Sequence, residues 1–198
     1  SYSGQVCISV QNVWVDQNVK ATFEDVFSQR VRSLACGDPA VSGIQCGPMI
    51  SDREADRVHS WIQTAVNQGA ILLTGGGRNG RMVEPTILNE PTVDSPIVAQ
   101  EAFGPVVNLF SFEDIGEVWS KINTSRFGLQ AGIFTNDLQT ILTAYEQLDV
   151  GGVIVNDVPT FRSDNMPYGG IKESGLGREG VKYAIEDMTE PKLLMLGG

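Results

Sequence analysis

The chain has 198 residues, of which 41% are hydrophobic and 19% charged, a composition typical of a soluble globular protein with a good core. Its 14 Lys and Arg residues against 24 Asp and Glu residues give a net charge of −10, which argues against nucleic acid as a partner. No apolar run approaches the length of a membrane span and no signal peptide is visible, so we expect no membrane partner.

The chain has three cysteines, Cys7, Cys36 and Cys46. Their number is odd, and no two of them are spaced as Cys-x-x-Cys. This pattern predicts neither a disulfide framework nor a zinc site, and it suits a reducing, cytoplasmic location. His59 is the only histidine, which limits any histidine-based metal or triad chemistry. We therefore expect no metal site. The chain opens at Ser1 inside a motif, so we expect a domain fragment.

The first predicted elements are a strand and two helices. Residues 9–15 are apolar and β-branched, which predicts a short strand, and the helical spacing of apolar residues over 17–34 predicts an amphipathic helix. A second helix is predicted to begin after Ser51, which forms a capping box with Glu54, and to close at Gly69.

Two glycine-rich stretches match the pattern G-x-G-x-x-G, which is a nucleotide fingerprint only when it links a strand to a helix. Residues 75–80 follow a predicted strand over 70–74, but residues 81–85 after them are extended, so a turn is predicted. Residues 175–180 precede a helix, but no strand comes before them, so a helix-entry turn is predicted.

Strands and helices continue to alternate in the second half of the chain. The expected elements are a strand ending near residue 112, a helix over 114–123, a strand over 130–135, a helix over 138–148 and a strand over 153–155. Such alternation predicts an α/β fold with an open, mostly parallel sheet and flanking helices. The long Gly- and Pro-rich loop over 156–177 is predicted to be functional. Residues 191–196 predict a terminal strand that needs a partner.

The first chemically informative segment is residues 3–8, which contain Cys7. A thiol just after Gly4 and Gln5 is placed where the backbone can turn tightly and leave the sulfur accessible, with its own backbone N–H available to an oxyanion. Cysteines outside disulfides are ordinarily buried and inert, and this segment alone favours that interpretation.

Four segments in a fixed order change that interpretation. They are residues 4–7 (Gly-Gln-Val-Cys), 101–105 (Glu-Ala-Phe-Gly-Pro), 127–132 and 166–175. Together they resemble the nucleophile motif, the Glu-x-Phe-Gly-Pro motif and the downstream motifs of the NAD(P)-dependent aldehyde dehydrogenase superfamily. The resemblance covers essentially the whole chain but only the C-terminal, catalytic half of the family's chain. It implies that residues 1–198 are the thiol-bearing catalytic domain, and that the Rossmann-type cofactor domain, the oxyanion-hole asparagine and the water-activating glutamate lie upstream.

The resemblance also implies roles for three residues. Cys7 would be the catalytic nucleophile, which attacks an aldehyde to give a thiohemiacetal; hydride transfer to NAD or NADP then leaves a thioester for water to hydrolyse. Glu101 would bind the nicotinamide ribose, because a carboxylate can accept hydrogen bonds from both ribose hydroxyls. Phe103 would pack against the nicotinamide. The alternative for Glu101 is a loop carboxylate that caps a turn.

Substrate contacts are implied on the long loop. Phe161 and Tyr168 match positions that line the family's aldehyde pocket, with core packing as the alternative. Arg162 is the candidate for binding an anionic substrate tail, with an ordinary surface arginine as the alternative. Asn12 stands where the family usually has a basic residue. Residues 191–196 resemble the family's oligomerisation strand, so a homo-oligomer, dimer or tetramer, is implied.

Two other functions stay open from the residues. A cysteine-dependent hydrolase or acyltransferase would need His59 as its base, whereas the position of His59 off the apolar stripe of its helix predicts a partly exposed structural residue. A non-catalytic α/β interaction domain would bury an unreactive Cys7. The sequence favours an aldehyde dehydrogenase that acts on a small aldehyde, and it leaves the aldehyde and the choice between NAD and NADP unassigned. We expect the isolated chain to be inactive.

Overall fold

The computed structural model describes residues 2–198, which form two compact units, one ending at Lys121 and one beginning at Ile122. In residues 2–198 no helix is both long and apolar enough to span a bilayer. The same residues contain no cluster of three or more His, Cys, Asp and Glu side chains suited to a metal ion. The assignment of residues 1–198 to a single catalytic domain stays a prediction.

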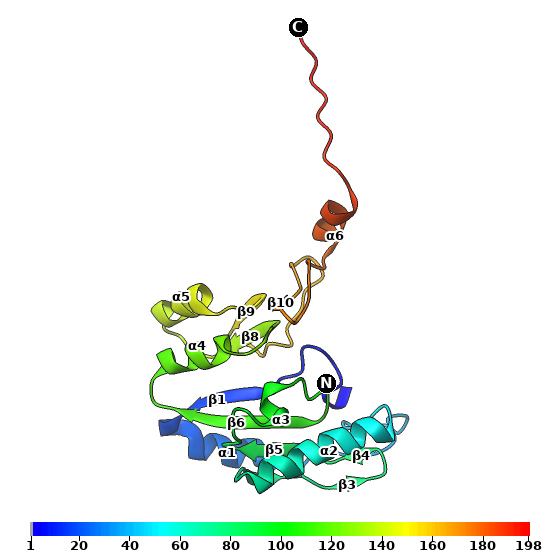
Figure 1. Ribbon diagram of the computed structural model, residues 1–198, viewed down its shortest axis with the longest axis vertical. Coiled ribbons are helices and arrows are strands. Elements are labelled where there is room, and N and C mark those ends of the chain that lie inside the picture. The colour runs from blue at the N-terminus through cyan, green and yellow to red at the C-terminus, as the bar shows by residue number, and fades with distance from the viewer. Residues whose placement is uncertain (1) are drawn as a thin grey trace. The chain divides into compact units, whose positions relative to one another are not determined.

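The first unit is built on a four-stranded sheet. Its strands, in spatial order, are β1 (Asn12–Asp16), β6 (Val106–Phe112), β5 (Thr86–Asn89) and β2 (Ile71–Thr74) (Figure 1). β1 and β5 both run parallel to β6, and β2 pairs antiparallel with β5 at one edge. The predicted mostly parallel α/β sheet is confirmed. β5 was not predicted, because all four of its residues are buried and it lacks the alternation of a half-exposed strand.

Helices cover both faces of this sheet. They are α1 (Gln17–Arg32), α2 (Asp52–Asn67) and the short α3 (Pro96–Ala99). α2 begins where predicted, since the Ser51 hydroxyl accepts a hydrogen bond from the Glu54 N–H at 3.3 Å. α2 and α3 form a core with Leu88 of β5, whereas Ile87 faces the other side of the sheet, where α1 lies (Figure 1).

A hairpin follows β2. Its strands are β3 (Arg78–Asn79) and β4 (Met82–Val83), which pair antiparallel. Gly75, Gly76 and Gly80 have positive φ angles of 75°, 87° and 55°. Residues 75–80 therefore form a turn, as predicted, and open no helix.

The second unit begins within α4 (Ile115–Asn123) and contains two small sheets. Its further elements are β7 (Phe127–Gly128), β8 (Gln130–Ile133), α5 (Leu138–Gln147), β9 (Gly152–Val155), β10 (Ile171–Lys172) and α6 (Val181–Met188). β8 and β9 pair parallel across α5, which confirms the predicted strand–helix–strand order. β10 pairs antiparallel with β7 and anchors the long loop.

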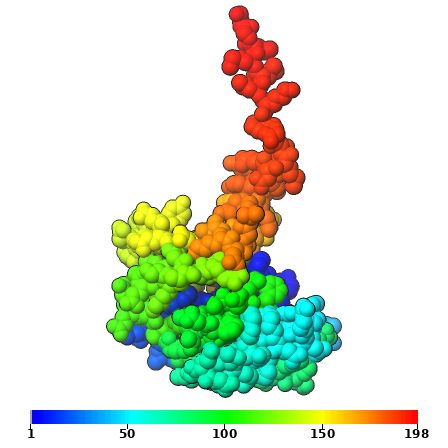
Figure 2. Space-filling model, in the orientation of Figure 1, coloured from blue at the N-terminus to red at the C-terminus, as the bar shows by residue number. Residues whose placement is uncertain are grey.

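The C-terminal segment differs from its prediction. Residues 189–198 belong to no helix or strand and form the single thread of atoms at the red end of the chain (Figure 2). The exposed fractions of Leu193, Leu194, Met195 and Leu196 are 82%, 81%, 79% and 86%. The predicted terminal strand is not formed here, because a strand needs a neighbouring strand to pair its backbone and no described strand pairs with these residues.

Candidate active site

Cys7 lies in a turn that the backbone closes with a hydrogen bond from the Ser9 N–H to the Val6 carbonyl at 3.0 Å. The turn follows the short 3-10 helix η1 (Tyr2–Gly4), whose last residue has a φ of 72°. The Cys7 side chain is exposed. A tight turn thus presents Cys7 to solvent, whereas its local sequence favours a buried cysteine.

Gly4 brings this segment into direct contact with the Glu-Ala-Phe-Gly-Pro loop. A Cβ atom at Gly4 would lie 1.9 Å from the carbonyl oxygen of Gly104, far inside van der Waals contact. Its φ of 72° also favours glycine. The structure therefore brings the segment that carries Cys7 against the loop that carries Glu101 and Phe103.

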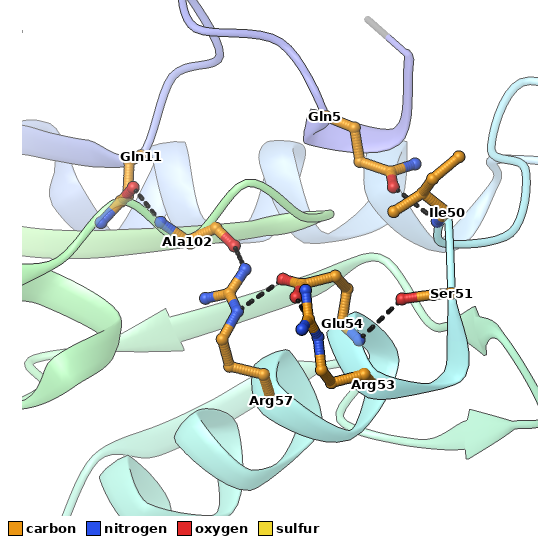
Figure 3. A network of polar contacts seen from close by, with 8 residues as sticks. All are labelled: Gln5, Gln11, Ile50, Ser51, Arg53, Glu54, Arg57 and Ala102. Carbon is orange, nitrogen blue, oxygen red and sulfur yellow. Dashed lines mark hydrogen bonds and ion pairs between the residues drawn. The ribbon is translucent and has the colours of Figure 1, made fainter.

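The backbone of Ala102 fixes that loop from both sides (Figure 3). The Ala102 N–H donates to Gln11 Oε1 at 2.9 Å, and its carbonyl oxygen accepts from Arg57 Nη2 at 2.7 Å. Gln11 Nε2 also donates to the carbonyl oxygen of Gln100 at 2.6 Å. Ala102 is 2% exposed, so these bonds are shielded from solvent and the loop has a defined position.

Arg57 is itself held on α2. Its Nε lies 2.7 Å from Glu54 Oε2, and its guanidinium carbon lies 4.4 Å from the centroid of the Trp61 ring. The hydrogen bond from Arg57, with the nearby charges of Arg57 and Arg53, lowers the pKa of Glu54, so its carboxylate stays ionised. Glu54 was predicted to complete a capping box, but its carboxylate instead orients the arginine that binds Ala102.

Glu101 and Phe103 flank the buried Ala102 and are both exposed. Phe103 has a φ of 47°, which bulky residues rarely adopt and which costs about 1–3 kcal/mol. An exposed carboxylate beside an exposed ring suits a ligand that joins hydroxyl groups to a planar ring.

The segment before Cys7 rests on residues 47–50. Ser3 Oγ accepts from the Gly47 N–H at 2.8 Å. Gln5 Oε1 accepts from the Ile50 N–H at 2.8 Å (Figure 3). An open cavity of about 600 Å³ lies between these segments, and Phe103 lines it. The backbone that leads into the thiol is therefore held in place by side-chain hydrogen bonds to a second loop.

In the second unit, Arg162 and Tyr168 lie together. Arg162 Nη2 is 2.7 Å from Glu179 Oε2, and its guanidinium carbon lies 4.2 Å from the centroid of the Tyr168 ring. Tyr168 and Glu179 are joined by two backbone hydrogen bonds of 2.6 and 3.1 Å. Tyr168 is 5% exposed and Phe161 47% exposed. The ring of Tyr168 is therefore buried, and Arg162 is held over it.

Two further residues are structural. His59 is half-buried on α2, as predicted, and its Nδ1 has no hydrogen-bond partner among residues 2–198. Asn12 Oδ1 accepts from Asn108 Nδ2 at 2.8 Å, and Asn108 Nδ2 also donates to the Ile97 carbonyl at 2.8 Å. Asn12 thus helps to fix β1 beside α3, in keeping with a packing role.

Sequence reasoning missed Gln11, Arg57 and Asn108. None belongs to a motif, and each acts through a partner between 11 and 96 positions away along the chain. A lone polar side chain says nothing about such a partner. The nearest available signal is that Gln11 is a polar residue within the predicted strand over 9–15, where an amide can bond across to a neighbouring loop.

Comparison with known proteins gives one consistent result. Residues 1–194 match the model of the aldehyde dehydrogenase family. The chain is 46% identical over 194 residues to a 3-sulfolactaldehyde dehydrogenase of Priestia aryabhattai, which covers 98% of this chain and 41% of that protein. It is 41% identical to a lactaldehyde dehydrogenase of Methanococcus maripaludis strain C5, with coverage of 98% and 42%.

A solved structure agrees. The glyceraldehyde-3-phosphate dehydrogenase GapN from Methanocaldococcus jannaschii, complexed with NADP, superposes with a TM-score of 0.91 at 41% identity, covering 94% of this chain and 41% of that one. The chain thus spans about two fifths of the length of the relatives it matches. The predicted resemblance is confirmed, and the chain belongs to the aldehyde dehydrogenase family.

Proposed function

We propose that the protein to which this chain contributes oxidises an aldehyde to a carboxylic acid with NAD or NADP, and that Cys7 is its nucleophile. One observation carries the proposal: the exposed Cys7 lies in a segment that packs, through Gly4, against the loop of Glu101 and Phe103. The family membership supports the reaction class. Catalysis needs a thiol and a cofactor-binding loop close together, and these two segments are in contact.

In this chemistry the Cys7 thiolate forms a bond to the carbonyl carbon, and the carbonyl electrons move to oxygen to give a thiohemiacetal. The Cys7 backbone N–H would stabilise that oxyanion. A bound nicotinamide cofactor would supply the acceptor for the hydride that leaves this carbon. Glu101 would bind hydroxyl groups of the cofactor, and Phe103 would pack against its planar ring. Water then releases the acid from the thioester on Cys7.

We propose that the aldehyde is small and carries an anionic tail, which Arg162 binds. An arginine suits sulfonate, carboxylate or phosphate because its planar guanidinium can donate two parallel hydrogen bonds. Glu179 and the Tyr168 ring hold the guanidinium in one orientation, which lowers the entropy lost on binding. Among the relatives, 3-sulfolactaldehyde dehydrogenase and glyceraldehyde-3-phosphate dehydrogenase are named for anionic substrates, whereas lactaldehyde dehydrogenase is named for a neutral one.

The test compares substrates in the whole protein. Arg162→Ala should raise KM for a carboxylated, sulfonated or phosphorylated aldehyde by about tenfold or more, and should leave KM for propanal nearly unchanged. Arg126→Ala is the matched control, because Arg126 also pairs with a glutamate, Glu173, and lies over an aromatic ring, that of Phe127. An equal change for both substrates would remove Arg162 from the substrate site, while leaving the reaction class intact.

We further propose that the protein is a homo-oligomer in a reducing, cytoplasmic compartment. The apolar, unpaired segment 191–196 supports assembly through strand pairing, and the exposed thiols of Cys7 and Cys36 support a reducing location. Replacing Leu194 and Leu196 with aspartate should lower the mass measured by light scattering. An unchanged mass would contradict assembly through this segment.

A further inference from the structure

Cys36 and Cys46 lie directly opposite each other outside the named strands. They form an isolated parallel bridge, in which the Gly37 N–H donates to the Cys46 carbonyl at 3.0 Å and the Cys46 N–H donates to the Ala35 carbonyl at 3.1 Å. Chain segments paired in this way run about 4.8 Å apart. Disulfides join residues whose Cα atoms are about 4.4–6.8 Å apart, so this register suits a disulfide.

The register also sets the direction of the two side chains. Residues directly opposite each other in a parallel pair point to the same face, so the Cys36 and Cys46 side chains lie on one side of the bridge. Burial, the neighbouring Cys46 thiol and the charge of Glu84 raise the pKa of the Cys36 thiol.

The two cysteines differ in access to solvent. Cys36 is exposed, whereas Cys46 is 3% exposed. An exposed thiol can attack a reagent in solution, and a buried thiol beside it can react only with what its neighbour carries. This is the arrangement of an attacking and a resolving cysteine.

We propose that Cys36 and Cys46 form a modification site, an intrachain disulfide made by exchange with a small disulfide such as oxidised glutathione. Cys36 loses its proton and attacks one sulfur of the reagent, so that the reagent's S–S bond breaks and one thiolate leaves. Cys46 then loses its proton and attacks Cys36 Sγ, which expels the second thiolate. Two cysteine thiols give up two electrons and two protons, and one disulfide becomes two thiols.

The cysteine count alone predicts no disulfide framework, and this site is independent of the proposed function. It nonetheless adjoins the segment that supports Cys7. Gly47, directly after Cys46, binds Ser3, and Ile50, four residues after Cys46, binds Gln5. A Cys36–Cys46 bond would constrain the start of that supporting segment without consuming Cys7.

The native chain can be tested directly, because cleavage after Arg32 and Arg53 leaves both cysteines in one peptide, residues 33–53, while Cys7 lies in another. The chain is incubated with oxidised glutathione, alkylated with iodoacetamide, digested with trypsin and analysed by mass spectrometry. We expect a 33–53 peptide whose mass is lower by two hydrogen atoms and which carries neither an alkyl group nor glutathione. The amount of this disulfide form should exceed the amount of glutathione-bearing 33–53 peptide by more than about tenfold. The reaction should accelerate as pH rises above neutrality, since it needs the Cys36 thiolate.

Two variants separate the roles. Cys46→Ser should leave one glutathione on Cys36, and Cys36→Ser should leave Cys46 unmodified in the native state but reactive in urea. A native 33–53 peptide that is mainly glutathione-bearing, or mainly alkylated twice, would overturn the proposal. That readout uses the unmodified sequence, so it decides the question even where a variant fails to fold.

Discussion

Gln11 Oε1 accepts a hydrogen bond from the Ala102 N–H at 2.9 Å, across 91 positions of the chain. Gln11 lies four residues after Cys7, and Ala102 lies between Glu101 and Phe103. The turn that presents the thiol and the loop that presents the carboxylate therefore share one anchor. A second contact, between Gly4 and Gly104, fixes the same pair of segments.

Gly4 should not tolerate a side chain. Gly4→Ala places a Cβ against the Gly104 carbonyl and forces alanine into a positive φ, so the free energy of unfolding should fall by about 3 kcal/mol. Gly43→Ala is the matched control, since Gly43 has a φ of 88° but nothing within 4 Å of the added Cβ; it should cost only about 1 kcal/mol. Urea unfolding measures both. Equal losses would show that φ alone matters at Gly4.

Arg57 should contribute to stability through Ala102. Arg57→Ala removes the hydrogen bond to a buried carbonyl, and the free energy of unfolding should fall by about 2 kcal/mol. Arg53→Ala removes a partner of the same carboxylate, Glu54, from a side chain that is 89% exposed, and should have no measurable effect. A loss at Arg53 as large as that at Arg57 would assign the effect to the Glu54 pairs and not to Ala102.

Glu90 should make stability depend on pH in the acid range. Its burial, the largest single influence, raises its pKa, but hydrogen bonds from Lys20 and Ser111 outweigh it, so the pKa lies below its usual range. The contribution is thus present above the unfolded pKa of about 4.3 and is lost as pH falls through the folded value.

The Glu90→Gln variant tests that sign. It should be less stable than the native chain at pH 7, and the difference should shrink as pH falls below about 4. Ser111→Ala, which removes one of two donors from the same residue, should show a smaller loss of the same sign. A difference that grows towards low pH would contradict the assignment. Urea unfolding at a series of pH values gives the comparison.

Glu179 should act as a positioning residue for Arg162. In the whole protein, Glu179→Gln should raise KM for an anionic aldehyde several-fold while kcat and the KM for propanal stay nearly constant, because the guanidinium loses its fixed orientation. Glu173→Gln, which removes the partner of Arg126, is the matched control and should change neither KM. Equal effects of both substitutions would show that the Arg162–Glu179 pair has only a structural role.

Much of the fold was predictable because local chemistry determines it. Ser51 caps α2 as its spacing from Glu54 indicates, and the strand–helix–strand order of β8, α5 and β9 follows from apolar periodicity. β5 was not predicted because a strand buried on both faces lacks alternation. Residues 191–196 carry a strand-like pattern, but pairing depends on a partner that local sequence does not contain.

The site was predictable only in part. Motifs located Cys7, Glu101 and Phe103, but not the side chains that fix them, since Gln11 and Arg57 are set by contacts distant in sequence. The bridge between Cys36 and Cys46 was equally invisible, because cysteine spacing does not reveal backbone register. The catalytic roles of the motif residues remain predictions for experiment.

The central claim, that Cys7 is the nucleophile, is tested most directly by trapping the acyl-enzyme. The whole protein is mixed with its aldehyde and NAD or NADP, quenched in acid within one turnover, digested with trypsin and analysed by mass spectrometry. We predict an acyl group on the peptide that ends at Lys20 and contains Cys7, and its absence in Cys7→Ser, whereas Cys36→Ser and Cys46→Ser retain it. An acyl group on another residue, or undiminished aldehyde oxidation by Cys7→Ser, would contradict the account.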